Sequence, residues 1–78
     1  MTNFRQNPPQ EIVNQLVSFY NKGHLYNSFE QARTLIIKYP KSILIWNILG
    51  ASALQLKMFD EAINAYKKCI YLNPHYAE

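Results

Sequence analysis

The 78-residue sequence contains one cysteine and two glycines. Because Cys69 has no second cysteine to pair with, a disulfide framework is excluded and a reducing compartment is expected. The scarcity of glycine and the absence of strictly alternating apolar and polar residues argue against a fold built on sheets. We therefore expect an all-α protein.

The sequence also lacks the apolar runs that direct a protein into a membrane. Its first residues, MTNFRQNPPQ, have no basic segment followed by an apolar stretch, so they do not resemble a signal peptide. The most apolar segment, residues 42–57, is shorter than the roughly 20 residues of a membrane-spanning helix and contains polar side chains. We expect no membrane partner and a cytoplasmic location.

Charged residues are scarce, at 17% of the chain, and the basic ones are scattered along it. Single-stranded nucleic acid requires a basic stripe beside exposed aromatic rings, so no nucleic-acid partner is expected. The histidines, His24 and His75, have no second ligand at metal-binding spacing. Cys69 lies at an apolar helical position, which is typical of a buried thiol rather than a nucleophile. We expect no catalytic residue, cofactor or metal site, and hence no enzyme.

Apolar side chains surround almost the whole circumference of residues 42–57, which predicts a central helix covered by its neighbours. Ser42 is expected to cap this helix, and Gly50 in its middle indicates that another helix approaches closely there. Three amphipathic helices are expected around it. The first starts at or just after Pro9, the second is capped by Asn27 with Glu30 in a capping box, and the third is capped by Asp60.

Several helix-forming and helix-ending residues recur with a spacing of 34. The pairs are Ser18 and Ser52, Leu25 and Phe59, Ile36 and Ile70, and Pro40 and Pro74. A generic antiparallel four-helix bundle explains the amphipathic pattern but not this shared offset. The spacing predicts two helical hairpins that repeat every 34 residues.

The second hairpin resembles the tetratricopeptide repeat family in its residues Trp46-x2-Leu49-Gly50, Ala62-x3-Tyr66 and Pro74. It departs from the family at Ala53, where a large aromatic is usual, and at Lys57, where Gly is usual. The first hairpin is more degenerate, because Gln15 and Leu16 replace the expected Leu-Gly. It keeps the turn, packing and stop positions at Gly23, Leu25, Ser28, Ala32, Leu35 and Pro40.

The resemblance implies two antiparallel helical hairpins, four helices in all, stacked as a right-handed superhelix. The expected organisation is a flexible tail over residues 1–8, repeats at about 9–42 and 43–76, and the start of a third at 77–78. Arrays of such repeats usually contain three or more units. Either this chain is the N-terminal part of a longer repeat protein, or it covers its last helix by self-association. The resemblance extends to bacterial proteins in which such an array precedes a transferase domain.

The resemblance also implies a protein–protein interaction module that binds a peptide or protein segment in a concave groove, lined by the first helix of each hairpin. The groove candidates are uncharged: Gln10, Val13, Asn14, Val17, Tyr20, Asn21, Leu44, Asn47, Ala51, Leu54 and Gln55. Without Lys or Arg at these positions, the groove is not expected to grip a C-terminal carboxylate. Alternatively, Val13, Val17, Leu44 and Leu54 belong to the core or are covered by further repeats.

The second functional alternative is a homodimer formed through the outer face of the last helix. Its candidate residues are Ile63, Ala65, Ile70 and Tyr71. An exposed apolar patch of this kind marks an interaction surface, and a two-fold dimer would cover it. Ile70 is also a candidate for the internal core.

Overall fold

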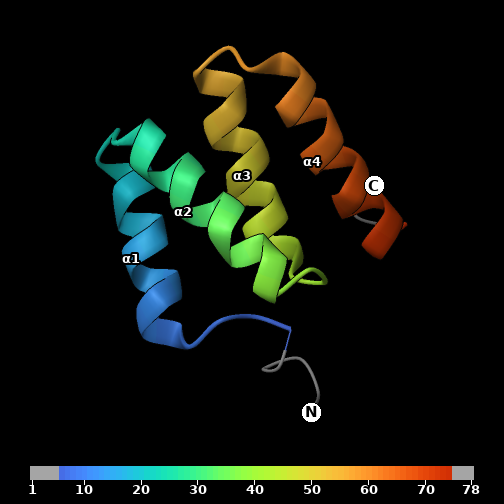
Figure 1. The fold of residues 1–78 in the computed structure, drawn as a ribbon, viewed down its shortest axis with the longest axis horizontal. Coiled ribbons are helices and arrows are strands. Elements are labelled where there is room, and N and C mark those ends of the chain that lie inside the picture. Colours follow the sequence, from blue (N-terminus) through green and yellow to red (C-terminus); the bar gives the residue numbers. More distant parts are fainter. Residues whose placement is uncertain (1–5, 75–78) are drawn as a thin grey trace.

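The computed structural model describes residues 6–74, which fold into four helices without a strand (Figure 1). This confirms the predicted all-α class. The helices are α1 (Gln10–Asn21), α2 (Leu25–Lys38), α3 (Ile43–Gln55) and α4 (Phe59–Leu72).

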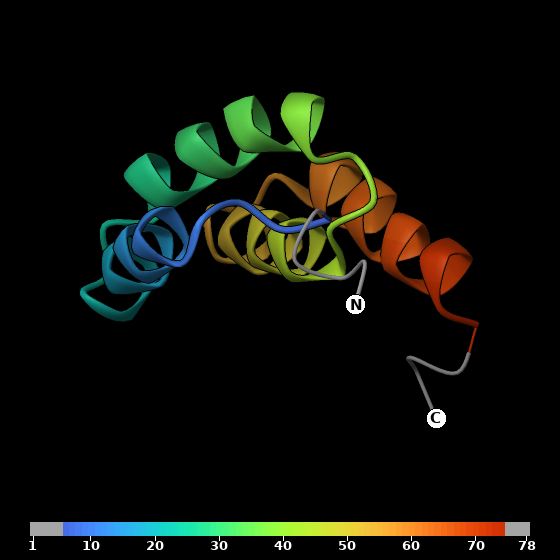
Figure 2. The same cartoon turned by 90° about the horizontal axis from the view of Figure 1, so that it is seen from below.

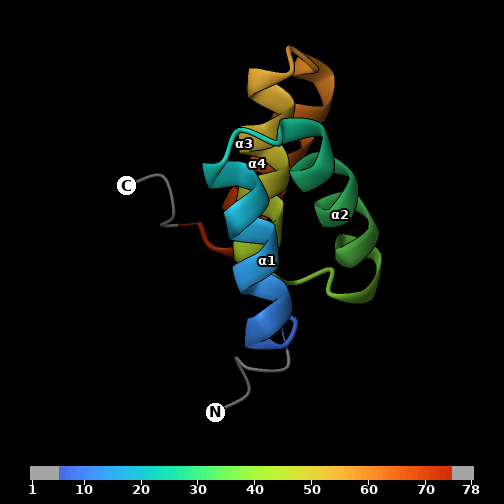
Figure 3. The same cartoon turned by 90° about the vertical axis from the view of Figure 1, so that its left-hand side faces the viewer.

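Helix α3 is the centre of the fold, as its apolar circumference predicted. It contacts α1, α2 and α4, whereas α4 packs against α3 alone among the helices. Figure 1 shows α3 between α2 and α4, Figure 2 shows α2 above α3 with α4 beside it, and Figure 3 shows α1 in front of α3 with α2 to one side. The arrangement is a pair of stacked helical hairpins, α1–α2 and α3–α4.

The two hairpins repeat at the predicted spacing, because both ends of α4 lie 34 residues after those of α2. The turns inside the hairpins also match. The His24 N–H donates to the Phe19 carbonyl at 2.9 Å, and the Met58 N–H donates to the Ala53 carbonyl at 2.8 Å. These donors and acceptors are again 34 residues apart, so the two turns close through equivalent hydrogen bonds.

A left-handed residue follows the first helix of each hairpin. Gly23 has a φ of +79° and Lys57 a φ of +65°. The second value confirms that Lys57 adopts a conformation that favours glycine, since a Cβ atom is crowded there. The second turn therefore keeps the left-handed geometry of the first, although Lys57 stands where the first turn has Gly23.

The expected caps of the second helices of both hairpins are wrong. Helix α2 begins at Leu25 rather than after Asn27, and α4 begins at Phe59 rather than after Asp60; neither start has a side-chain cap. After the left-handed residue only one residue, His24 or Met58, separates the two helices, so the chain has re-entered helical geometry before it reaches Asn27 or Asp60. Asp60 instead lies in the first turn, where its charge is favourable to the helix dipole.

The start of α3 follows the prediction, since the Ser42 hydroxyl accepts a hydrogen bond from the Ile45 N–H at 3.2 Å. The same hydroxyl donates to the Asn7 side-chain oxygen, and Pro8 is buried. Residues 6–8 were expected within a flexible tail, but Asn7 and Pro8 pack against the folded chain. The rest of that tail and the predicted start of a third repeat lie outside the described residues.

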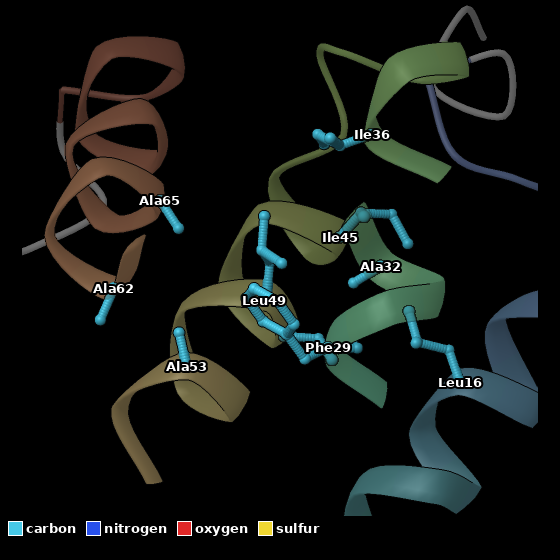
Figure 4. Packing of buried hydrophobic residues seen from close by; sticks show 10 residues of the cluster. Leu16, Phe29, Ala32, Ile36, Ile45, Leu49, Ala53, Ala62 and Ala65 are labelled. Atoms are coloured by element: carbon cyan, nitrogen blue, oxygen red, sulfur yellow. The ribbon is translucent and has the colours of Figure 1, made fainter. Parts of the chain in front are cut away.

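The core lies where α3 meets its neighbours (Figure 4). Its larger members are Leu16, Phe29, Ile36, Ile45, Ile48 and Leu49, whereas its α4 members, Ala62 and Ala65, are small. A Cβ atom on Gly50 would lie 3.1 Å from the Tyr66 ring and 3.2 Å from the Ala65 Cβ. The predicted close approach at Gly50 is therefore the α3–α4 contact.

Candidate functional site

A shallow depression of about 400 Å³ follows the open face of α1. Five of its lining residues are predicted groove residues: Gln10, Val13, Asn14, Val17 and Asn21. The three amide side chains among them are exposed, and the Gln10 Nε2 donates to the Asn14 Oδ1 at 2.9 Å. The surface offers amide donors and acceptors above apolar side chains, and Lys22 at one end is its one charged residue.

Two further groove candidates connect α1 to α3. The Gln55 Nε2 donates a hydrogen bond of 2.7 Å to the Tyr20 hydroxyl. Because Tyr20 lies in the last turn of α1 and Gln55 is the last residue of α3, this bond joins the two helices at one end. A phenol and an amide are thereby held together on the surface.

The remaining candidates differ in their accessibility. Leu44, Asn47 and Ala51 are half-buried, and Leu54 is exposed. Val13 is only 6% exposed, and Val17 and Leu44 pack against the core. The apolar candidates on α1 therefore act mainly as the floor beneath the amides, and they form much less of the open surface.

On α4, the apolar stripe predicted for self-association is only partly present. Ile63 and Ile70 are exposed, at 52% and 47%, and Phe59 extends the same stripe one turn toward the N-terminus. Ala65 was placed there wrongly, because it is fully buried and its Cβ faces Gly50. Its small side chain is what allows α3 and α4 to approach.

Tyr71 is 79% exposed but lies on a different face of α4 from Ile63 and Ile70. It lines a second depression, of about 650 Å³, between α2 and α4. Its apolar lining includes Ile36, Trp46 and Leu49. Reasoning from the sequence missed this hollow, since it forms only when two helices of different hairpins are placed around α3.

Among residues 6–74, no group of three or more His, Cys, Asp and Glu side chains is arranged to hold a metal ion. Cys69 is fully buried, as predicted, and burial raises the pKa of its thiol. Its Sγ lies 3.8 Å from the Ile43 carbonyl oxygen, which accepts a weak hydrogen bond from it. No helix in the described part of the chain has the length and apolarity to cross a bilayer.

Stacked hairpins, repeated turns and a central apolar helix define a small helical-repeat protein. In a comparison with protein-family models, residues 43–76 match the family described as Tetratricopeptide repeat. The matched segment contains α3 and α4, and the stacked hairpins are consistent with a protein of this family. Comparisons with curated proteins and with solved structures gave no match. Repeats of this family are in general protein–protein interaction modules.

Proposed function

We propose that this chain binds a peptide or protein segment on the face formed by α1 and α3. The observation that carries the proposal is the depression on α1, which gathers five of the uncharged residues predicted to line a groove. The Tyr20–Gln55 hydrogen bond links this face to α3. Amide side chains pair with the main chain of an extended peptide, and the tyrosine supplies contact area.

The chemistry of this face defines the ligand that it favours. Gln10, Asn14 and Asn21 donate and accept hydrogen bonds without carrying charge. A segment with polar main-chain groups and small apolar side chains suits the face, whereas a C-terminal carboxylate would find a single cation, Lys22, at one end of it and no cluster of cations. The free-acid and amidated forms of one peptide are therefore expected to bind equally.

The proposal is tested with peptides selected from a random display library against the folded chain. Fluorescence anisotropy measures the Kd of a selected peptide for the unaltered chain and for the Asn14→Ala/Asn47→Ala variant. We expect the double substitution to weaken binding at least tenfold. The matched control, Thr34→Ala/Lys38→Ala on exposed positions of α2, is expected to leave Kd within twofold.

If both variants weakened peptide binding equally, or if neither variant weakened it, the α1–α3 face would be excluded as the binding site. A tenfold preference for the free-acid form of the peptide would show that the ligand is read through its carboxylate, which contradicts the uncharged chemistry proposed for the face.

Self-association through α4 is a second candidate, supported by the exposed stripe of Phe59, Ile63 and Ile70. An apolar stripe of this kind is stabilised when another helix covers it. Light scattering over a concentration series is expected to show a dimer that Ile63→Glu dissociates. Circular dichroism must show unchanged helicity in the variant. A monomer at all concentrations would exclude this alternative.

A further inference from the structure

The depression between α2 and α4 has an apolar floor and a basic rim. Ile36 from α2 and Trp46 and Leu49 from α3 supply the apolar surface. Arg33 lies on the α2 side, and Lys67 and Lys68 lie on the α4 side. A volume of about 650 Å³ accommodates one or two large side chains of a partner.

The positive charge of this rim is largely uncompensated. Among residues 6–74, the one ion pair joins Arg33 to Glu30 at 3.2 Å, so neither lysine of the rim is engaged in an ion pair there. Glu61 is the single carboxylate that lines the depression. With Arg33 already paired, two free lysines face one free carboxylate, and the surplus is positive.

Trp46 is held in a defined orientation at this site. Its indole N–H donates to the Pro40 carbonyl at 2.8 Å, and the Lys68 ammonium lies 5.8 Å from the centre of its ring. An anion that approaches Lys68 therefore also approaches an aromatic surface. Aromatic and cationic groups of this kind are enriched at the energetically important positions of protein interfaces.

The depression is distinct from the α1 surface and meets the Phe59 stripe only at Lys67. Glu61, Asn64, Lys68 and Tyr71 are spaced three, four and three residues apart and share one face of α4, whereas Phe59, Ile63 and Ile70 occupy another. Lys67, four residues after Ile63 and three before Ile70, lies between the two faces. The α1 depression shares no residue with the depression between α2 and α4. A peptide on α1 would leave the hollow between α2 and α4 open, and a protein covering the Phe59 stripe would reach it only at Lys67.

We propose that the depression between α2 and α4 is a second docking site, and that its occupant is an acidic protein segment carrying an apolar side chain. The apolar side chain would cover Ile36, Trp46 and Leu49, and its acidic neighbours would approach Lys67 and Lys68. Charge complementarity selects the acidic segment, and the apolar floor selects a protein over a nucleic acid. Nucleic acid requires a longer basic track than two lysines, and Glu61 would repel its phosphates.

The test uses the single tryptophan of the chain as its probe. An eight-residue peptide of Asp and Glu with one central Leu, blocked at both ends, is titrated at about 150 mM salt while Trp46 emission is recorded. We expect saturable binding with a change in emission. Replacing the Leu of the peptide by Ser is expected to weaken binding at least fivefold, because the floor is then left uncovered.

The decisive comparison is between two variants with the same change in net charge. Lys67→Glu/Lys68→Glu reverses the rim, and Lys38→Glu/Lys41→Glu reverses two exposed lysines that do not line the depression. We expect at least a tenfold loss of affinity for the first and less than a threefold loss for the second. Circular dichroism controls for folding. Amide chemical shifts are expected to move around Trp46 and Lys68.

Equal loss in both variants would mean non-specific charge attraction and would overturn the proposal. Competition between the acidic peptide and a ligand of the α1–α3 face would also overturn it, because the two sites share no residue. Tighter binding of a single-stranded oligonucleotide than of the peptide would assign the hollow to nucleic acid instead. Failure of this site leaves the proposed function of the α1–α3 face untouched.

Discussion

The hydroxyls of Ser28 and Ser52 lie 2.6 Å apart in the core and join the first hairpin to the second. Both side chains are fully buried, and Ser28 also donates to the Leu25 carbonyl at 3.0 Å. Because the Ser28 hydroxyl donates its hydrogen to the Leu25 carbonyl, Ser28 accepts the shared hydrogen bond and Ser52 donates it. The two serines therefore depend on each other unequally.

This inequality gives the first prediction. Ser28→Ala leaves the Ser52 hydroxyl without its partner in the core and is expected to lower the free energy of unfolding by about 1–3 kcal/mol. Ser52→Ala leaves Ser28 bonded to Leu25 and is expected to cost about 0.5–1.5 kcal/mol. Urea denaturation followed by circular dichroism measures both, with half-buried Ser18 as the control for a Ser→Ala change.

A double-mutant cycle completes this test. The Ser28→Ala/Ser52→Ala variant removes both hydroxyls together, so its cost is expected to be smaller than the sum of the single costs. Strict additivity would show that the two hydroxyls are not coupled, and a larger loss for Ser52→Ala than for Ser28→Ala would refute the assignment of donor and acceptor.

The second prediction concerns the close contact at Gly50. Alanine is a better helix former by about 1 kcal/mol, but its Cβ would lie 3.1 Å from the Tyr66 ring and 3.2 Å from the Ala65 Cβ. Overpacking of a core typically costs about 1–3 kcal/mol. Gly50→Ala is therefore expected to destabilise the chain by about 1 kcal/mol in thermal unfolding.

Tyr66→Leu provides the background that tests the cause, because it removes the ring from this contact. The cost of Gly50→Ala is expected to shrink when it is introduced together with Tyr66→Leu. Stabilisation by Gly50→Ala in the unaltered chain would instead show that α4 yields readily at this point.

The third prediction uses the two left-handed residues. Lys57 has a φ of +65°, so Lys57→Gly relieves backbone crowding but also increases the entropy of the unfolded chain. The net gain is expected to be about 0.5 kcal/mol, or a rise in Tm of roughly 2–4 °C for a domain of this size.

Gly23 is the matched control, since it occupies the equivalent turn position and a Cβ atom added there would meet only open space. Gly23→Ala is expected to lower Tm through its backbone conformation alone. A fall in Tm for Lys57→Gly would mean that the lysine side chain contributes more to stability than its backbone conformation costs.

The fourth prediction concerns the buried thiol of Cys69, whose pKa is raised by burial. Above about pH 8.5 the thiol of the unfolded chain ionises while the folded chain keeps its proton, so folding becomes less favourable as the pH rises. The stability that the protonated Cys69 thiol contributes to the folded chain is fully present at lower pH and is lost as the pH rises through the alkaline range.

Unfolding curves from about pH 7 to 10 for the unaltered chain and for Cys69→Ala measure this contribution. The stability difference between the two is expected to decrease at alkaline pH. Thiol reagents are expected to label Cys69 much more slowly in the native chain than in urea. Equal labelling rates would place the thiol at the surface.

The sequence predicted those features of the fold that depend on local pattern. Residue types and their spacing were enough to predict four features. These are the apolar circumference of α3, the 34-residue repeat, the Ser42 cap and the close contact at Gly50. Cys69 was correctly predicted to be buried from its apolar helical position, and in the structure it shares its buried face with Ala62 and Ala65.

The sequence was less informative about features that depend on how the helices are placed relative to one another. Asn27 and Asp60 are favourable capping residues, but each turn closes so tightly behind its left-handed residue that the helix has begun before the cap position is reached. Ala65 was assigned to the outside because only the packed structure shows which side of α4 meets Gly50. The depression between α2 and α4 needed the positions of three helices.

The dependence of α4 on α3 alone has a consequence for the order in which the chain opens. In arrays of repeats, stability is the sum of each unit's own stability and its coupling to the nearest neighbour. Helix α3 is held from three sides, whereas α4 is held from one. Native-state hydrogen exchange would therefore find the two end helices, α1 and α4, opening before α3, which contacts every other helix. A protein bound across α2 and α4 would add a second attachment to α4 and suppress its opening, so ligand binding at the hollow would be recorded as slower exchange along α4.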